Sequence, residues 1–174
     1  MTSHYLINLL GATGLAVKDA LDRTASSVTG LQGEAPAALL TIGTRPGRPI
    51  EDLRRALDLS HSGTVRLVAR LQRRDWVKRV AAKDGREVRL HLTGAGEVVV
   101  HRLLAARRAA LEVMLAAVPE EDRPYLKRGL SRLLGKLAST REQAWHVCRL
   151  CEHGVCRGES CPVGSAVGDR DAPP

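Results

Sequence analysis

The sequence has 174 residues, with 27 lysines and arginines against 19 aspartates and glutamates, and so a net charge of +8. A hydrophobic fraction of 44% is enough for a packed core and excludes a wholly disordered chain. The near absence of aromatic residues argues against a surface that stacks single-stranded bases. The longest uncharged stretch, residues 1–17, is too short for a membrane helix and lacks the cationic start of a secretory signal. We therefore expect a cytoplasmic protein with no membrane partner.

The positive charge is concentrated in residues 45–91, which carry 13 basic and 6 acidic side chains. A localised basic block of this kind is the electrostatic footprint of a nucleic-acid surface. A basic face that meets only solvent would have the same composition, so charge alone leaves both interpretations open.

Apolar periodicity predicts helices in the first half of the chain, over residues 3–29, 34–44, 50–58 and 61–74. Two prolines and a glycine predict a turn at 45–49. Ser60 is expected to cap the helix at 61–74, with Val65, Val68 and Leu71 facing the core.

The period then changes from helical to alternating. Strands are predicted over 76–81 and 87–92, with a hairpin turn at Asp84-Gly85. Thr93 is expected to cap a long helix over 94–117. The acidic residues 120–122 start a last long helix and are interpreted as caps rather than catalytic groups. Its apolar stripe comprises Leu126, Leu130, Leu133, Leu134 and Leu137.

A helix, a turn, a second helix and a two-stranded hairpin, all inside the basic block, follow the order of a winged helix-turn-helix. The predicted fold class is mainly α with a small β-hairpin wing (α+β). Such a fold places its second helix in the major groove of double-stranded DNA. The residues predicted to contact DNA are His61, Ser62, Thr64, Arg66, Arg70, Arg73, Arg74 and, at the hairpin tip, Arg86.

The predicted DNA contacts differ in kind. Arg66 is the candidate for a guanine contact, because it lies in the N-terminal half of the helix. Arg70, Arg73 and Arg74 lie further along and are expected to meet phosphates. Arg86 is placed to reach a minor groove.

Residues 39–96 resemble the multiple antibiotic resistance regulator (MarR) family of bacterial repressors. The resemblance rests on four matches: Thr64-Val65-Arg66, Asp75-Trp76-Val77-Lys78-Arg79, Asp84-Gly85-Arg86 and Leu92-Thr93-Gly94-Ala95-Gly96. Asp75 replaces the glycine that this family usually has after the recognition helix. The resemblance implies that Asp84 braces the wing and that Arg86 enters the minor groove.

The resemblance also implies that the first helix and the two long C-terminal helices intertwine with a second subunit. The apolar stripe at 126–137 independently favours a homodimer, although packing within one chain would also cover it. Two recognition helices about one DNA turn apart fit a pseudo-palindromic operator. MarR-like proteins also commonly bind a small aromatic or phenolic effector between the dimer helices and the wing domain.

All four cysteines lie in one short segment with the spacing C-x2-C-x4-C-x4-C, at Cys148, Cys151, Cys156 and Cys161. Short spacers let four thiolates converge on one ion, so the segment predicts a metal site. Zinc is the favoured metal, an iron–sulfur cluster is the alternative, and a metal-free thiol switch is a third interpretation. His146 and His153 flank the site and are expected near the metal rather than bound to it.

These features predict a dimeric DNA-binding transcription regulator, with repression as the expected action. The segment is either a structural clip or a metal or redox sensor. The alternatives are an iron–sulfur electron-transfer protein and a zinc-knuckle RNA-binding module. No phosphate-binding loop, Ser-His-Asp order or HExxH motif is present, so we expect no enzyme. The predicted units are a dimerisation helix, the winged helix-turn-helix, two dimerisation helices, the cysteine-rich segment and a disordered tail, over residues 1–33, 34–93, 94–141, 142–163 and 164–174.

Overall fold

The computed structural model describes residues 3–81, 87–156 and 160–168. In chain order its helices are α1 Ser3–Thr29, α2 Ala35–Thr44, α3 Ile50–Leu57, α4 His61–Arg73, α5 Gly94–Leu115, the 3-10 turn η1 Glu120–Asp122, α6 Arg123–Leu134, α7 Arg141–Val147 and α8 Pro162–Ala166. Its strands are β1 Arg48–Pro49, β2 Val77–Ala81 and β3 Val88–Leu92. The predicted class, mainly helical with a small antiparallel sheet, is confirmed.

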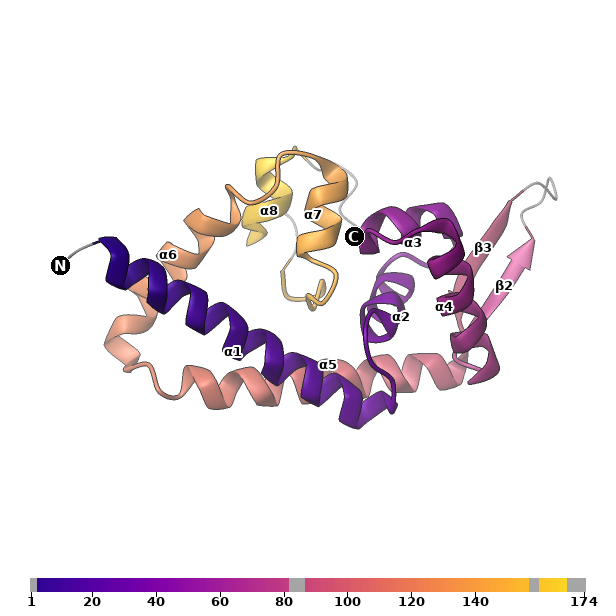
Figure 1. Ribbon diagram of the computed structural model, residues 1–174, viewed down its shortest axis with the longest axis horizontal. Helices are drawn as coiled ribbons and strands as arrows, with labels where there is room; N and C mark the ends of the chain where they lie inside the picture. Colours follow the sequence, from indigo (N-terminus) through magenta and orange to yellow (C-terminus); the bar gives the residue numbers. More distant parts are fainter. Residues whose placement is uncertain (1–2, 82–86, 157–159, 169–174) are drawn as a thin grey trace.

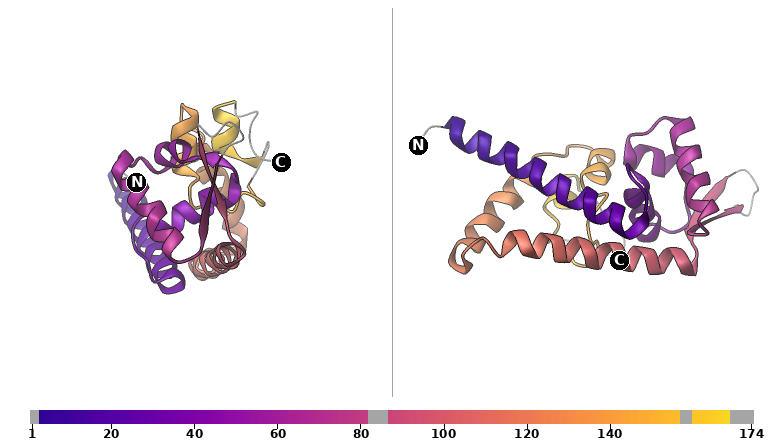
Figure 2. Two further views of the ribbon diagram at one scale, coloured as in Figure 1. Left: turned by 90° about the vertical axis from the view of Figure 1, so that its right-hand side faces the viewer. Right: turned by 60° about the horizontal axis from the view of Figure 1, so that its bottom comes forward.

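Helices α1 and α5 run side by side along the long axis of the molecule (Figures 1 and 2). The sheet and helices α2, α3 and α4 gather at one end of this pair. Helix α6 turns back at the other end, which brings α7 and α8 between α6 and α3. None of the helices in the described ranges has both the length and the hydropathy to cross a lipid bilayer.

The main core lies under the winged-helix elements. Leu39 of α2, Leu71 of α4 and Leu90 of β3 are at most 1% exposed and belong to one apolar cluster. Val99 and Leu103 of α5 close this cluster from below. Burial of side chains this large supplies most of the free energy that holds α4 on the sheet.

The sheet has three strands in the order β1-β3-β2, all antiparallel. The prediction of a plain turn over 45–49 and of a two-stranded hairpin was therefore incomplete. Arg48 lies opposite Leu90, and Pro49 lies opposite Arg89. In the sequence, the prolines predicted only a turn. Proline is nevertheless tolerated in an edge strand, where one side of the strand needs no backbone N–H for pairing.

The caps predicted at Ser60 and Thr93 are confirmed, whereas Asp122 makes no side-chain cap hydrogen bond at the start of α6. The Ser60 side chain accepts a hydrogen bond from the Gly63 amide, and the Thr93 side chain accepts one from the Gly96 amide. The tail was predicted to lack structure from residue 164. Helix α8 instead continues to Ala166, because Val163 is buried against a second small cluster.

Large apolar side chains remain exposed along α1 and α6. They are Tyr5, Leu6, Ile7, Leu9, Leu10 and Leu15 on α1, with Tyr125, Leu126, Leu130 and Leu133 on α6. Exposed apolar side chains in this number favour an interaction site on these two helices.

Gly96→Ala should destabilise the protein strongly. A Cβ at Gly96 would lie 2.0 Å from the Trp76 carbonyl oxygen, and backbone cannot yield as a flexible side chain does. We expect a loss of about 1–3 kcal/mol or more in urea unfolding. The matched control is Gly94→Ala, where a Cβ meets nothing within 4 Å. Similar unfolding free energies for the two variants would contradict this close approach.

Candidate nucleic-acid interface

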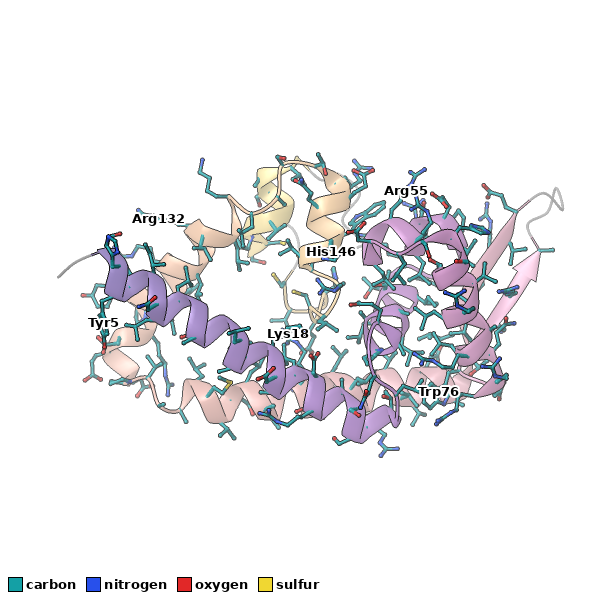
Figure 3. The ribbon with its side chains drawn as sticks, viewed as in Figure 1. Tyr5, Lys18, Arg55, Trp76, Arg132 and His146 are labelled. Atoms are coloured by element: carbon teal, nitrogen blue, oxygen red, sulfur yellow. The ribbon has the colours of Figure 1, made fainter. Side chains whose placement is uncertain are left out.

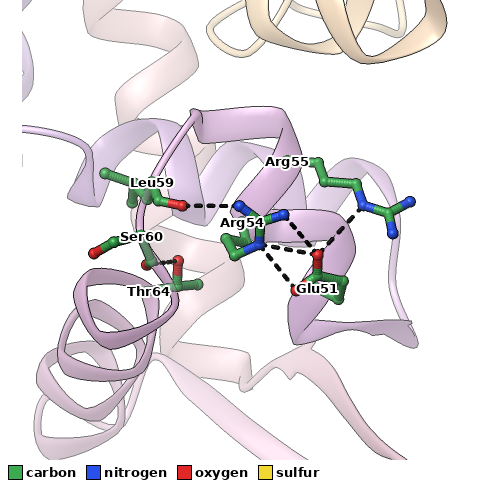
Figure 4. Close-up of polar contacts among 6 residues, drawn as sticks. All are labelled: Glu51, Arg54, Arg55, Leu59, Ser60 and Thr64. Carbon is green, nitrogen blue, oxygen red and sulfur yellow. Dashed lines mark hydrogen bonds and ion pairs between the residues drawn. The ribbon is translucent and has the colours of Figure 1, made fainter.

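The turn before α4 is held by Arg54 of α3. Its guanidinium pairs with the Glu51 carboxylate at 2.8 Å and donates to the Leu59 carbonyl at 3.3 Å (Figure 4). Ser60 then caps α4 by accepting a hydrogen bond from the Gly63 amide. The residues just before α4 and the first turn of α4 are therefore both held by hydrogen bonds. These contacts set the direction in which the start of α4 points.

The outer face of α4 presents four of the residues predicted to contact DNA. His61 and Ser62 are exposed in its first turn, and Arg66 and Arg73 are exposed on later turns. The positive pole of the helix N-terminus lies beside the two short polar residues. Hydroxyl, imidazole and guanidinium groups in this arrangement can donate hydrogen bonds to phosphate and to base edges.

Thr64 is a corrected prediction. Its side chain is only 1% exposed, and its hydroxyl donates to the Ser60 carbonyl at 3.0 Å. It therefore packs beneath the helix start and presents nothing to a ligand. Val65 was expected to face the core but is only half-buried, whereas Leu67, which was not predicted to face the core, is buried. The buried row is 64, 67, 68 and 71, which is one helical face.

Arg70 and Arg74 bind within the chain. Arg70 donates to the Gln32 carbonyl at 3.3 Å, and its Nε is buried without a partner. Arg74 donates to the Thr29 carbonyl at 3.4 Å and lies 5.4 Å from the centre of the Trp76 ring. Both side chains turn toward the end of α1. This geometry does not favour the prediction that they contact DNA phosphates.

The wing contributes further basic groups. Asp84 and Arg86 lie outside the described residues, so their predicted roles stay predictions. Lys78 and Arg89 are exposed on the strands and were missed as site residues. The register pairs Lys78 with His91 and Val80 with Arg89, on the face opposite Leu90. Strand alternation in the sequence was the signal that could have identified them.

A cleft of about 940 Å³ lies between α1, the segment 31–34, α2, α5 and residues 147–151. Leu21, Leu40 and Leu103 contribute apolar wall, while Lys18 and Arg107 contribute positive charge. Sites of this size with apolar walls and few charges suit a small amphipathic ligand.

Helix α7 fastens the cysteine-rich segment to the winged helix. The Arg45 guanidinium lies 3.9 Å from the centre of the Trp145 ring. His146 Nδ1 lies 3.2 Å from the Ala56 carbonyl oxygen of α3, where Figure 3 shows His146 at the α3–α7 boundary. Arg149 pairs with Glu34 at 3.4 Å. The segment therefore contacts the winged helix at α3 and at both ends of α2.

The four thiols lie together as two hydrogen-bonded pairs, Cys148 with Cys151 and Cys156 with Cys161. The hydrogen bond from Cys148, aided by the Arg107 guanidinium, lowers the pKa of Cys151 to about 7. Burial and the neighbouring thiols raise the pKa of Cys156 to about 11. Across the described residues, no group of three or more cysteine, histidine or acidic side chains is arranged to hold a metal ion. The zinc site thus stays a prediction.

The two flanking histidines have other partners. His146 contacts the Ala56 carbonyl, and His153 Nε2 lies 3.3 Å from the Cys148 carbonyl oxygen. Burial lowers the pKa of His153. That neither histidine is a direct ligand stays a prediction.

Residues 29–87 match the model of the MarR family. This segment is therefore similar to a MarR family domain. RV1404 from Mycobacterium tuberculosis is 18% identical with a TM-score of 0.69, covering 78% of this chain and 94% of that one. YusO from Bacillus subtilis is 16% identical with a TM-score of 0.66, over 78% and 99%. FabT from Streptococcus pneumoniae, solved in complex with DNA, is 19% identical with a TM-score of 0.63, over 75% and 94%. No curated protein sequence matches the chain.

The observed order of helices and strands is the one that the resemblance implied. Helix α4 occupies the place of the recognition helix, and β2 and β3 that of the wing. The MarR family match ends at residue 87. The cysteine-rich segment therefore lies beyond it.

Arg74→Ala should weaken folding, whereas Arg73→Ala should not. Arg74 loses a hydrogen bond to the Thr29 carbonyl and its contact with the Trp76 ring, for a cost of about 0.5–1 kcal/mol. Arg74 is exposed as well, but the Arg73 side chain has no hydrogen bond or ring contact with another described residue, so its change should stay within about 0.5 kcal/mol. Urea unfolding of both variants measures this difference, and an equal loss in both would refute the inward role of Arg74.

Proposed function

We propose that this chain is a dimeric, sequence-specific regulator of transcription that binds double-stranded DNA in the cytoplasm and acts as a repressor. The observation that carries the proposal is the outer face of α4. His61, Ser62, Arg66 and Arg73 are exposed together there, while the opposite face of the same helix is locked in the core. A rigid helix with polar and basic groups on one side suits readout of a major groove.

Two structural neighbours support DNA as the ligand. One is the FabT structure in complex with DNA, and the other is a mutant of MepR from S. aureus bound to an oligodeoxyribonucleotide. The MepR mutant is 19% identical, with a TM-score of 0.55, over 79% of this chain and 99% of that one. The basic block at 45–91 supplies the charge that such a ligand requires.

A second copy of the chain is the proposed cover for the apolar faces of α1 and α6. These faces lie at the end opposite the winged helix, as Tyr5 and Arg132 do relative to Trp76 (Figure 3). A two-fold dimer formed there would carry two α4 helices toward successive major grooves of a pseudo-palindromic operator.

The cleft is the proposed site of a small effector. It is bounded by α1 and α5, which belong to the proposed dimer region, and by α2, which belongs to the winged helix. A ligand that fits one relative position of these helices better than another would shift DNA affinity. We further propose that the metal or redox state of the four thiols tunes the same affinity.

Arg66→Ala should reduce binding to the specific operator more than binding to random DNA, by about 1–3 kcal/mol of discrimination if Arg66 contacts guanine. Arg73→Ala should mainly lower the slope of affinity against salt, by about one ion. Fluorescence anisotropy on selected and random duplexes measures both. Arg132→Ala, at the far end of the molecule, is the control. Unchanged specific binding in both test variants would reject α4 as the reading helix.

Leu130→Glu should split the dimer. The side chain is 46% exposed within the apolar stripe of α6, so a charge there would be buried by the second copy. Sedimentation should then show monomers at micromolar concentration, with weaker operator binding. Lys127→Glu places the same charge on an exposed residue of α6 outside the stripe and should leave the dimer intact. Monomeric wild-type protein would contradict the proposed assembly.

A further inference from the structure

The cysteine-rich segment has very little core of its own. Its apolar cluster contains three buried residues, Ala138, Ala144 and Val163, two of which are alanines. Burial on this scale cannot offset the conformational entropy of ordering residues 142–163, at about 1–2 kcal/mol per residue. Cys148 and Cys161 both pack against this cluster. Something other than apolar packing must therefore hold the segment together.

The four thiols beside this cluster are potential metal ligands. Cys148 and Cys161, one thiol from each pair, pack against the same small apolar cluster. The Cys161 sulfur also accepts a hydrogen bond from the Gly164 amide at 3.2 Å. Backbone N–H groups directed at sulfur stabilise a thiolate more than a thiol. The pairs must still draw together before all four sulfurs could share one ion.

A positive charge lies beside the thiols. Arg107 of α5 lines the same cleft as Cys151, and its Nε is buried without a hydrogen-bond partner in the described part of the chain. An orphaned guanidinium nitrogen is costly in a low-dielectric site unless an anion faces it. A divalent ion held by four thiolates carries two net negative charges, which would complement this guanidinium.

We propose that Cys148, Cys151, Cys156 and Cys161 bind one zinc ion and that Arg107 balances the charge of the resulting site. Each thiol that binds gives up its proton to solvent, so binding is coupled to proton release. Zinc suits a set of four sulfur ligands without any redox step. The binding free energy becomes folding free energy for the segment.

The zinc site would act as a strap on the winged helix, which is the part of this inference that rests on the proposed function. Helix α7 directly precedes Cys148 and is fixed to α3 through His146 and the Ala56 carbonyl, and to Arg45 through Trp145. Loss of zinc should release α7 from α3 and leave the angle between the winged helix and α5 less restricted.

The first test measures metal in the full-length protein, purified under argon. The expected result is about one zinc per chain, no iron or sulfide, and no visible absorbance. Replacement by Co²⁺ should give the ligand-field bands of tetrahedral thiolate coordination. Iron with sulfide would overturn the zinc assignment, and so would a metal-free protein whose four thiols react freely with a thiol reagent.

Two pairs of variants test the residues. Cys151→Ser should lose zinc, whereas Val155→Ser, at a residue 73% exposed in the same loop, should keep it. Arg107→Gln should weaken zinc about tenfold or more in competition with a chelator, as loss of a supporting contact typically does. Arg108→Gln removes an ion pair with Glu152 and should change zinc affinity by less than about threefold. Equal affinities for the two arginine variants would overturn the role of Arg107.

Removal of zinc from the wild-type protein tests the strap even if the cysteine variants do not fold. Amide hydrogen exchange should accelerate in α7 (residues 141–147) after chelation, while α4 stays protected by the main core. Operator binding by the zinc-loaded protein is measured alongside. Protein that holds zinc but binds no operator refutes the proposed function alone. Protein that is purified without metal and still binds its operator refutes this inference alone. An amide hydrogen exchange rate in α7 that chelation leaves unchanged does so too.

Discussion

The direction of α4 depends on the apolar core beneath it. Leu71 belongs to the main apolar cluster and has no exposed surface, so the helix cannot rotate about its axis without opening a cavity. The side chains on the outer face of α4 are therefore held in position by the packing of its inner face. The position of Arg66 in space follows from Leu71, from the cap at Ser60 and from the Arg54 contacts that hold the preceding turn.

The same constraint explains why the arginines of α4 separate into two groups. At about 100° per residue, Arg73 lies within roughly 20° of Arg66 around the helix, whereas Arg70 and Arg74 are rotated by roughly 40° and 80° toward α1. The sequence predicted the helix, its cap and the basic block. It did not reveal that the carbonyls of Gln32 and Thr29 would be within reach of the second group, because that depends on where α1 ends. Thr64 was misassigned for a related reason, since a short polar side chain can be satisfied by its own helix.

Features fixed by local chemistry could be predicted, and those fixed by long-range contacts could not. Asp84-Gly85 and the alternating residues around it indicated the hairpin, but β1 forms only because Arg48 reaches Leu90 across forty residues of chain. The cysteine spacing indicated a shared donor set, but nothing in that spacing placed Trp145 against Arg45. Arg107 could not be associated with the thiols from sequence, since only the packing of the segment beside α5 brings them together.

The cleft and the cysteine-rich segment share a wall, and this ties the two proposed modes of regulation together. Cys151 and Leu150 line the cleft, while Leu150 also packs against the main core. A ligand in the cleft would therefore touch the strap as well as α1 and α5. If the strap is ordered by a metal, part of the cleft is formed only when that metal is bound. Ligand and metal must then affect each other's affinity by the same factor, because coupling between two binding sites is reciprocal. Effector affinity measured with and without a chelator would thus report on the strap through a different site from the one that holds the metal.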